Sequence, residues 1–501
     1  MSPGEPTPTP ARKPNRLADG IVLLTILILT AVFVTLRIRT NGILTDSVAA
    51  QDTESYFQCA DRNFLTRSGY TCSRSAALPF LYSLLNPTGD HELTVLAEPF
   101  FGSAPRLAVQ PGTEAIILFQ LIFSIVSWVL FVWTAASLFE NPSARVFAAL
   151  ILFAFAFVPQ QSDWDSILLS ESLSFSFFIL MSAFFLWFLR FALSRPARNS
   201  RETVRAAAAA ALTFLSAAGW IFTRDTNAYY VALIALLCFG LTAAKLRRRA
   251  LRAAIVPGAL TIALAVLFLF QQSAFRESER WLLPMMNNYV GNVFPYETRV
   301  AWFAERGMPV SETLLTRTGS AEYNGVAEEK EFIEWLRNDG TKTYTAFLVD
   351  HPLLTALSVY NAADEFFAEN VQPFFYGAKE DKPRWAEPLG NLLHPLTSAL
   401  LLIAPALCLI LIGSRAAPGN PLWTVFACLL TAGGIALTGI AYLGEVRSIW
   451  RHVLSGVFML RLATWIGLLA VYDRTRLGDS AAPRGCPPRR PGPSPGRRSG
   501  R

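Results

Sequence analysis

Long apolar runs separated by short polar segments dominate the chain. A helix needs about 20 apolar residues to cross the hydrocarbon core of a bilayer. Ten runs reach or approach that length, and we expect each to form a transmembrane helix: 21–38, 115–139, 146–159, 167–193, 206–222, 228–244, 253–270, 389–412, 421–443 and 453–472. The third run is short, so we expect a helix that begins earlier, is tilted or is partly re-entrant. The pattern predicts an all-α polytopic membrane protein with about ten transmembrane helices.

The composition agrees with this class. Hydrophobic residues make up 52% of the chain and charged residues only 16%, whereas a soluble domain carries about 25% charged residues. The net charge of +7 comes without interleaved aromatic and basic residues, so it does not indicate a nucleic-acid partner. This composition predicts a protein that is surrounded by membrane lipid.

The basic residues between the runs predict an orientation. Loops rich in Lys and Arg remain in the cytoplasm, and the segments "SRPARNSRETVR" and "KLRRRALR" then fall on the same side as both termini. The segment 271–388, with 18 acidic and 11 basic residues, falls outside. Arg37 and Arg39, at the outer end of the first run, are the exception to this pattern.

The predicted organisation has five parts. They are a disordered basic cytoplasmic tail (1–19), an N-terminal module of helices one to seven with an outside loop at 40–114 (20–270), a large outside loop (271–388), helices eight to ten (389–472) and a disordered Arg- and Pro-rich cytoplasmic tail (473–501). Within the large loop, "AEEKEFIEWLRN" and "TYTAFLVDHPLLTALSVYNAADEFF" have the spacing of amphipathic helices, which we expect at the membrane surface or as a cap on the outer face.

Four polar clusters fall on the outer face in this topology. They follow helix one and join helices three and four, five and six, and nine and ten. Their charged residues are Asp46, Asp52 and Glu54; Asp163, Asp165 and Glu171; Arg224 and Asp225; and Glu445, Arg447, Arg451 and His452. Ionisable residues at membrane depth are costly and mark functional sites, although charges in short loops can also be merely solvated. Glu171 and Arg224 fit that second interpretation least, because they lie at or inside apolar helices.

The residue types indicate a chemistry. A carboxylate can act as general base on an acceptor hydroxyl, the D-x-D pair Asp163 and Asp165 can hold Mg²⁺ or Mn²⁺, and arginines recognise phosphate in a bidentate fork. The combination suits group transfer from a lipid-borne phosphate at the outer surface. Cys59 and Cys72 both fall in the first outside loop, where oxidation is allowed, and we expect a disulfide between them.

The stretch "QDTESYFQCADRNFLTRSGYTCSRSAALPFLYSLL" (51–85) resembles the first outside loop of GT-C-type membrane glycosyltransferases, the relatives of protein O-mannosyltransferases and aminoarabinose transferases. There an acid follows helix one and a segment like R-x-P-x-Y-P follows; here these are Asp52, Arg74, Pro79 and Tyr82. Three further parts of the chain are similar to family segments: the acidic pair Asp163 and Asp165, "SESLSF" and "FTRDTNAYYVAL". In the last of these, Asp225 stands where Pro is common in the family. "EVRSIWRHVL" lacks the Tyr and Pro of the family's C-terminal motif.

This resemblance implies that the chain is a membrane enzyme which transfers a sugar from a polyprenyl-phosphate donor to an extracytoplasmic glycan, lipid or protein, usually with inversion. In that family role Asp52 and Glu54 are the candidate catalytic residues. Arg224, Arg447, Arg74 and Tyr56 would bind the donor phosphate, and Asp163, Asp165 and Glu171 would orient the donor or hold a metal.

Two other functions remain open on the sequence. A secondary transporter also builds polar sites among helices, near the midplane and between broken or repeated helices; the apolar runs here show no matched breaks. A non-catalytic relative that serves as a partner in envelope assembly is the other alternative, and the incomplete C-terminal motif favours it.

Overall fold

The computed structural model describes residues 16–40, 47–50, 52–85, 93–95, 106–193, 200–316, 326, 329–372, 382–414, 421–447 and 449–481. Most of each predicted tail (1–15 and 482–501) lies outside the described residues. Both predicted tails, 1–19 and 473–501, are shorter in the structure, because the first helix begins at Arg16 and the last continues to Ala481.

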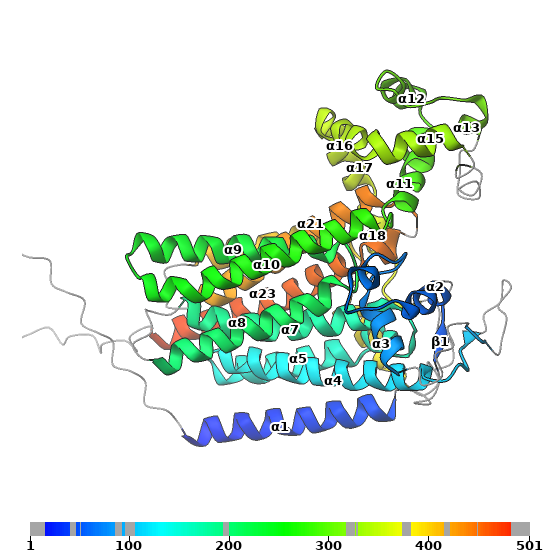
Figure 1. Cartoon of the computed structure of the whole chain (residues 1–501). Helices are drawn as coiled ribbons and strands as arrows, with labels where there is room; N and C mark the ends of the chain where they lie inside the picture. The colour runs from blue at the N-terminus through cyan, green and yellow to red at the C-terminus, as the bar shows by residue number, and fades with distance from the viewer. Residues whose placement is uncertain are drawn as a thin grey trace, which may run out of the picture.

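Eight helices of the described chain are long and apolar enough to cross a membrane. They are α1 (Arg16–Arg39), α4 (Thr113–Leu138), α7 (Ser170–Leu193), α8 (Ser200–Ile221), α9 (Asn227–Arg247), α10 (Leu251–Glu277), α21 (Pro421–Gly444) and α23 (Leu454–Ala481). Figure 1 shows them side by side in one bundle. In α23 and α7, 83% and 78% of the apolar window is buried, against 22% in α1, so α23 and α7 form the centre. The chain is an all-α polytopic membrane protein.

The third predicted span is bent. Helix α5 (Pro142–Phe157) ends at Val158, and a short segment from Pro159 to Ser166 leaves it at 60°. A residue before proline is pushed out of the helical region, and Val158 has the extended angles φ −63° and ψ 154°. The segment consists of α6 (Pro159–Ser162) and the 3-10 turn η3 (Asp163–Ser166). Counted with α5 as one span, it raises the number of candidate spans among the described residues to nine.

The eighth predicted span is broken, for the same reason. Helix α19 (Ala386–Leu393) ends before the His394–Pro395 pair, and α20 (Leu400–Gly413) follows as a separate apolar helix of 14 residues. The run 389–412, expected as one transmembrane helix, is therefore divided into two shorter helices. The segments that carry the breaks at Pro159 and Pro395 contact each other, because Gln160 Nε2 donates to Asn391 Oδ1 at 3.1 Å.

The first loop covers the end of the bundle at which α7 and α9 begin, which we call the loop end (Figure 1). It contains α2 (Thr53–Gln58), the 3-10 turns η1 (Cys59–Asp61) and η2 (Arg67–Tyr70), and α3 (Ala77–Leu85). Strands β1 (Val48–Ala49) and β2 (Arg106–Leu107) pair antiparallel. The loop is thus a folded layer rather than a solvated connection.

The large loop has an aromatic core of its own. Its helices are α11 (Leu282–Asn288), α12 (Glu297–Ala304), α13 (Glu312–Thr316), α15 (Lys330–Trp335), α16 (Thr341–Asp350), α17 (Pro352–Asn361) and α18 (Ala363–Phe366), with the π-turns η4 (Tyr289–Val293) and η5 (Leu336–Gly340). Tyr289 is fully buried at the centre, against Phe303, Phe332 and Trp335. The segment 343–367, predicted as one amphipathic helix, divides at His351–Pro352 into α16 and α17 and then continues as α18.

Candidate functional site

Backbone pairing fixes Asp52 next to the start of α7. The Leu168 N–H donates to Val48 O at 2.9 Å, and the Thr53 hydroxyl donates to Leu168 O at 3.0 Å. Asp52 stands between these two anchors, at the N-cap position of α2. The first loop and the segment before Glu171 are therefore held together by one main-chain bond and one side-chain bond to the main chain.

Arg451, on the short helix α22 (Ile449–His452), bridges the two acids of this region. Its NH1 donates to Asp52 Oδ2 at 2.5 Å and its Nε donates to Glu171 Oε1 at 2.6 Å. Glu171 lies in the first turn of α7 rather than a full turn inside it as predicted, and its side chain is 1% exposed. One guanidinium therefore ties the first loop, α7 and the turn before α23 together.

Two further arginines complete the group. Arg224 follows α8 and donates from NH2 to Glu171 Oε1 at 2.8 Å and from NH1 to the carbonyl of Arg451 at 2.7 Å. Arg74 donates from NH2 to Asp52 Oδ1 at 2.7 Å. We call Asp52, Arg74, Glu171, Arg224 and Arg451 the arginine–carboxylate network. It holds three cations against two carboxylates and keeps part of Asp52 and Arg74 exposed, which leaves an excess positive charge open to an anion.

The surroundings of Arg74 are built by the first loop. Its Nε donates to the Ser55 hydroxyl at 2.6 Å, and its guanidinium lies 5.3 Å from the centre of the Tyr56 ring. Tyr56 is buried and shares a hydrogen bond with Ser170, at 3.1 Å. The predicted Cys59–Cys72 disulfide is present, with the Cα atoms 5.9 Å apart, and it closes the segment that presents Arg74.

Arg280, after α10, ties the same loop to the α8–α9 turn. Its Nε and NH2 contact the two oxygens of Asp225 at 3.1 and 2.9 Å. Its NH1 donates to the carbonyls of Tyr70, Cys72 and Arg74. Asp225 thus serves as the partner of a buried arginine that holds the first loop in place.

The charges in the network keep Asp52 ionised. Burial alone would raise the pKa of Asp52, but the guanidiniums of Arg74 and Arg451 outweigh burial and hold that pKa below its ordinary value. The pKa of Arg451 is raised, since Glu171 and Asp52 more than offset its burial. Burial, together with Arg224 and Arg451, lowers the pKa of the neighbouring His452 to about 3. This imidazole is neutral at physiological pH.

The three predicted metal ligands occupy three different ion pairs. Asp163 pairs with Lys382, Asp165 pairs with Arg37, and Glu171 belongs to the arginine–carboxylate network. Asp163 and Asp165 are buried rather than exposed in a wet turn. Within the part of the chain that the structure describes, no group of three His, Cys, Asp or Glu side chains could hold a metal ion. The structure therefore does not bring these three acids together as one ligand set, and a need for Mg²⁺ or Mn²⁺ stays a prediction.

Glu54 and Arg447, also predicted as site residues, each contact a residue outside the arginine–carboxylate network. Glu54 is exposed on α2 and accepts from Gln58 Nε2 at 3.3 Å. The Arg447 N–H donates to Glu445 Oε1 at 3.1 Å, and Asn287 Nδ2 donates to the same oxygen at 2.9 Å. Glu445 is 7% exposed, and burial raises its pKa to about 7.

Sequence reasoning did not assign roles to four cations that the structure makes important: Arg37, Arg280, Lys382 and Arg451. One of them, Arg37, could have been noticed in the sequence, because it departs from the charge pattern predicted for the outer face. Its side chain is 1% exposed and also donates from NH2 to the Ser124 hydroxyl at 3.2 Å. A basic residue on the unexpected side of a membrane helix is thus a sign of an internal partner.

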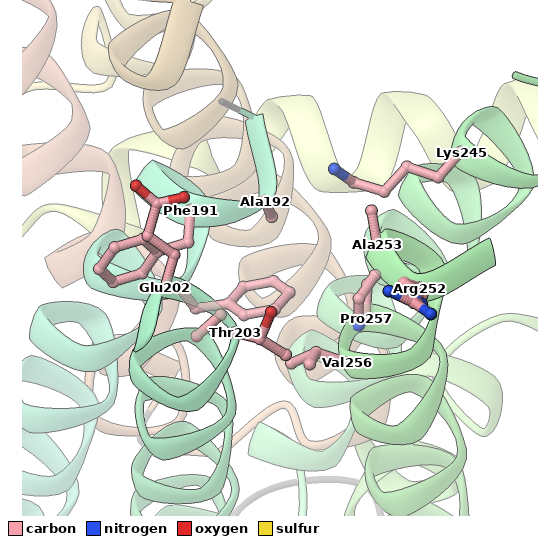
Figure 2. Close-up of a pocket in the computed structure, with 11 residues that line it drawn as sticks. Phe191, Ala192, Glu202, Thr203, Lys245, Arg252, Ala253, Val256 and Pro257 are labelled. Atoms are coloured by element: carbon pink, nitrogen blue, oxygen red, sulfur yellow. The ribbon is translucent and has the colours of Figure 1, made fainter. Parts of the chain in front are cut away.

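A small cavity of about 40 Å³ lies at the opposite end of the bundle, where α7 and α9 end (Figure 2). Phe188, Thr203, Lys245 and Val256 are among its lining residues. Ligand pockets have volumes of about 300–1,000 Å³, so this cavity has room for water rather than for a lipid head group.

Comparisons with known proteins give distant likenesses among solved structures. No family model matches the chain, and no curated protein matches it. Among solved structures, the chain is similar to the archaeal oligosaccharyltransferase AglB from Archaeoglobus fulgidus, in complex with an inhibitory peptide and a dolichol-phosphate. The TM-score is 0.38 and the identity 13%, over 92% of this chain and 55% of that one. The chain spans about half the length of that protein, and the likeness is too distant to bear on its chemistry.

Proposed function

We propose that this protein is a membrane glycosyltransferase that takes a sugar from a polyprenyl-phosphate donor. The observation that carries the proposal is the arginine–carboxylate network, in which an ionised acid lies among three guanidiniums at one end of a membrane bundle. Arginine forks bind phosphate through two parallel hydrogen bonds. A phosphate carried on a lipid reaches such a position from the membrane.

Each residue of the network has a task in a direct displacement. The acceptor hydroxyl attacks the anomeric carbon, Asp52 takes the hydroxyl proton, and the bond between that carbon and the phosphate oxygen breaks with its electron pair on the oxygen. Arg74, Arg224 and Arg451 stabilise the negative charge that develops on the leaving phosphate. Displacement from the opposite face inverts the anomeric configuration.

The low pKa of Asp52 suits this sequence of events. Without a donor, Arg74 and Arg451 hold the carboxylate ionised, which makes it a weak base. A bound phosphate shares those cations with Asp52, and the pKa of Asp52 then rises toward its ordinary value. Asp52 becomes a stronger base only when the donor is bound, which limits deprotonation of hydroxyl groups in the absence of a donor.

Glu171 has a positioning task. It is the common partner of Arg224 and Arg451 and is nearly inaccessible to solvent. An uncharged residue there would leave the two guanidiniums without the carboxylate that sets their spacing. Phosphate recognition by these arginines is thus expected to depend on Glu171 without direct contact.

The test is donor turnover by the purified protein in lipid nanodiscs. Polyprenyl-phosphate-linked hexoses and pentoses, each labelled in the sugar, are mixed with membrane extract as a source of acceptors. Appearance of label in a lipid-free or larger lipid-linked product supports the proposal. Intact donor across the whole panel, with folded protein, contradicts it.

A transporter is the second candidate, and the two helix breaks favour it. Broken helices with polar residues between them form transport sites, and here Gln160 and Asn391 meet beside the breaks at Pro159 and Pro395. Counterflow of labelled polyprenyl-phosphate or free sugars into proteoliposomes distinguishes the two functions. Uptake that survives Asp52→Asn would favour transport.

A further inference from the structure

A groove of about 520 Å³ separates the large-loop helices from the loop end of α21. This volume falls within the range of about 300–1,000 Å³ seen for ligand pockets. It lies away from Asp52 and Glu171, neither of which lines it. Its lining includes Tyr296, Tyr344 and Tyr442 together with Asn292, Ser358 and Asn361, and we call it the tyrosine groove.

The three tyrosines differ in how far they open onto the groove. Tyr296 is the most exposed of them, whereas the hydroxyls of Tyr344 and Tyr442 are hydrogen-bonded to Asn292 and Ser358. Tyr296 is 49% exposed, and the guanidinium of Arg299 covers its ring at 4.0 Å. Tyr344 is buried, with a hydrogen bond to the Asn292 side chain. The Tyr442 ring packs on Phe366, at 5.2 Å. Side chains of this kind offer an apolar surface with a hydrogen-bonding edge, which matches a ligand with C–H faces and hydroxyl edges.

The charge of the groove distinguishes it from the arginine–carboxylate network. Its charged lining residues are one arginine, Arg299, and one glutamate, Glu365. The remaining polar lining consists of amides and hydroxyls, which donate and accept hydrogen bonds without net charge. A neutral ligand rich in hydroxyls fits this lining better than a phosphate or a charged peptide does.

The groove shares an element with the network. Ile449 lines the groove and opens helix α22, whose third residue is Arg451. A helix rises about 1.5 Å per residue, so the Cα atoms of Ile449 and Arg451 are about 3 Å apart along the axis of α22. The Asn288 side chain bonds the carbonyl of Leu443, at 2.9 Å, and so holds the large loop on this wall.

We propose that the tyrosine groove binds a neutral saccharide. Resting on the proposed function, this saccharide is the acceptor whose hydroxyl is presented to Asp52. The donor phosphate and the acceptor sugar then have separate sites, distinguished by their charge and joined by α22.

The experiment measures binding of neutral hexasaccharides built of glucose, mannose or arabinose units to the full chain in nanodiscs, by saturation-transfer NMR and titration. Tyr296→Ala and Asn361→Ala remove a ring and an amide from the groove. Tyr360→Ala is the matched control, because Tyr360 precedes Asn361 on α17, is 75% exposed and is not a lining residue. Inorganic phosphate is added as a competitor.

We expect at least one hexasaccharide to bind saturably and to be weakened about tenfold or more by each groove variant. Binding to Tyr360→Ala, and binding in the presence of phosphate, should equal that of the wild type. Absence of saturable binding by all three sugars, equal losses in groove and control variants, or displacement by phosphate would each overturn the proposal. The two proposals fail separately, since saccharide binding without donor turnover in the wild type would contradict the proposed function alone.

Discussion

The guanidinium of Arg451 contacts the carboxylate of Asp52 at 2.5 Å, across 399 residues of sequence. Arg451 also contacts Glu171, so its side chain sets the distance between the first loop and the start of α7. Because both carboxylates accept hydrogen bonds from one planar guanidinium, the geometry of the arginine–carboxylate network depends on the position of that guanidinium.

Substitution of Arg451 by lysine should therefore impair sugar transfer while the charge is conserved. A lysine ammonium is a single point charge and cannot reproduce the two-sided fork. We expect Arg451→Lys to lower the rate of transfer about 100-fold, the size of effect seen when one preorganised donor is removed. Arg62→Lys, at an exposed position of the first loop, is the control and should match the wild type.

Glu445 should make the stability of the fold depend on pH near neutrality. Burial raises its pKa to about 7 from an ordinary value of 4.5. The folded protein thus binds this proton more tightly than the unfolded chain does. The resulting stabilisation is complete below the ordinary value and is lost as the pH rises through about 7.

We therefore expect the melting temperature to fall between about pH 5 and about pH 8, and the fall to be smaller in Glu445→Gln. Asp52 contributes the opposite dependence, because its lowered pKa stabilises the fold above the ordinary value of 3.8 and the effect is lost in stronger acid. The two groups act in separate windows. Equal pH profiles of the wild type and Glu445→Gln would refute the assignment to Glu445.

The disulfide between Cys59 and Cys72 should stabilise the segment that presents Arg74. Closing a loop of this size contributes about 3 kcal/mol, since the cysteines are 13 positions apart. The double substitution Cys59→Ser/Cys72→Ser should lower the free energy of unfolding by about this amount. Cys428→Ala, which leaves the cross-link intact, is the control. Peptide mapping without reductant should recover the two cysteines joined, and two free thiols would be the contrary result.

The buried pair of Asp163 and Lys382 should behave as a structural ion pair. The two side chains are 0% and 5% exposed, and the Lys382 ammonium also donates to the Ser162 hydroxyl at 2.7 Å. Burial lowers the pKa of Lys382. Lys382→Met alone strands a buried carboxylate and should cost about 3–5 kcal/mol. Asp163→Asn/Lys382→Met should recover most of that loss in thermal unfolding, whereas additive losses would contradict the pairing.

The sequence was sufficient to predict much of the network. Alternating apolar runs put Asp52, Glu171 and Arg224 on one face, because every second loop of a multi-pass chain lies on the same side. The structure brings these three together, and Arg74 with them. Local chemistry could also have predicted both helix breaks, since Pro159 and Pro395 each exclude the preceding residue from a helix.

The charge partners could not be predicted in the same way. Asp165 is neutralised by Arg37 of α1, and Asp163 by Lys382 of the large loop. Hydrophobic periodicity predicts which face of each helix is buried, but it does not predict which other helix that face packs against. The sequence therefore could not show that each acid of the D-x-D triplet is one half of an ion pair with a distant segment, and a metal at this pair stays a prediction.

The most direct test of the proposed function compares Asp52→Asn with Glu54→Gln, two residues apart on the same loop. Transfer of labelled sugar from polyprenyl-phosphate donors is measured in nanodiscs at matched amounts of folded protein. A general base contributes about 10²–10⁴-fold, so we expect a loss of that size in Asp52→Asn. Exposed Glu54 lies outside the network, so Glu54→Gln should transfer at the wild-type rate. Wild-type transfer by Asp52→Asn would contradict the assignment of the base.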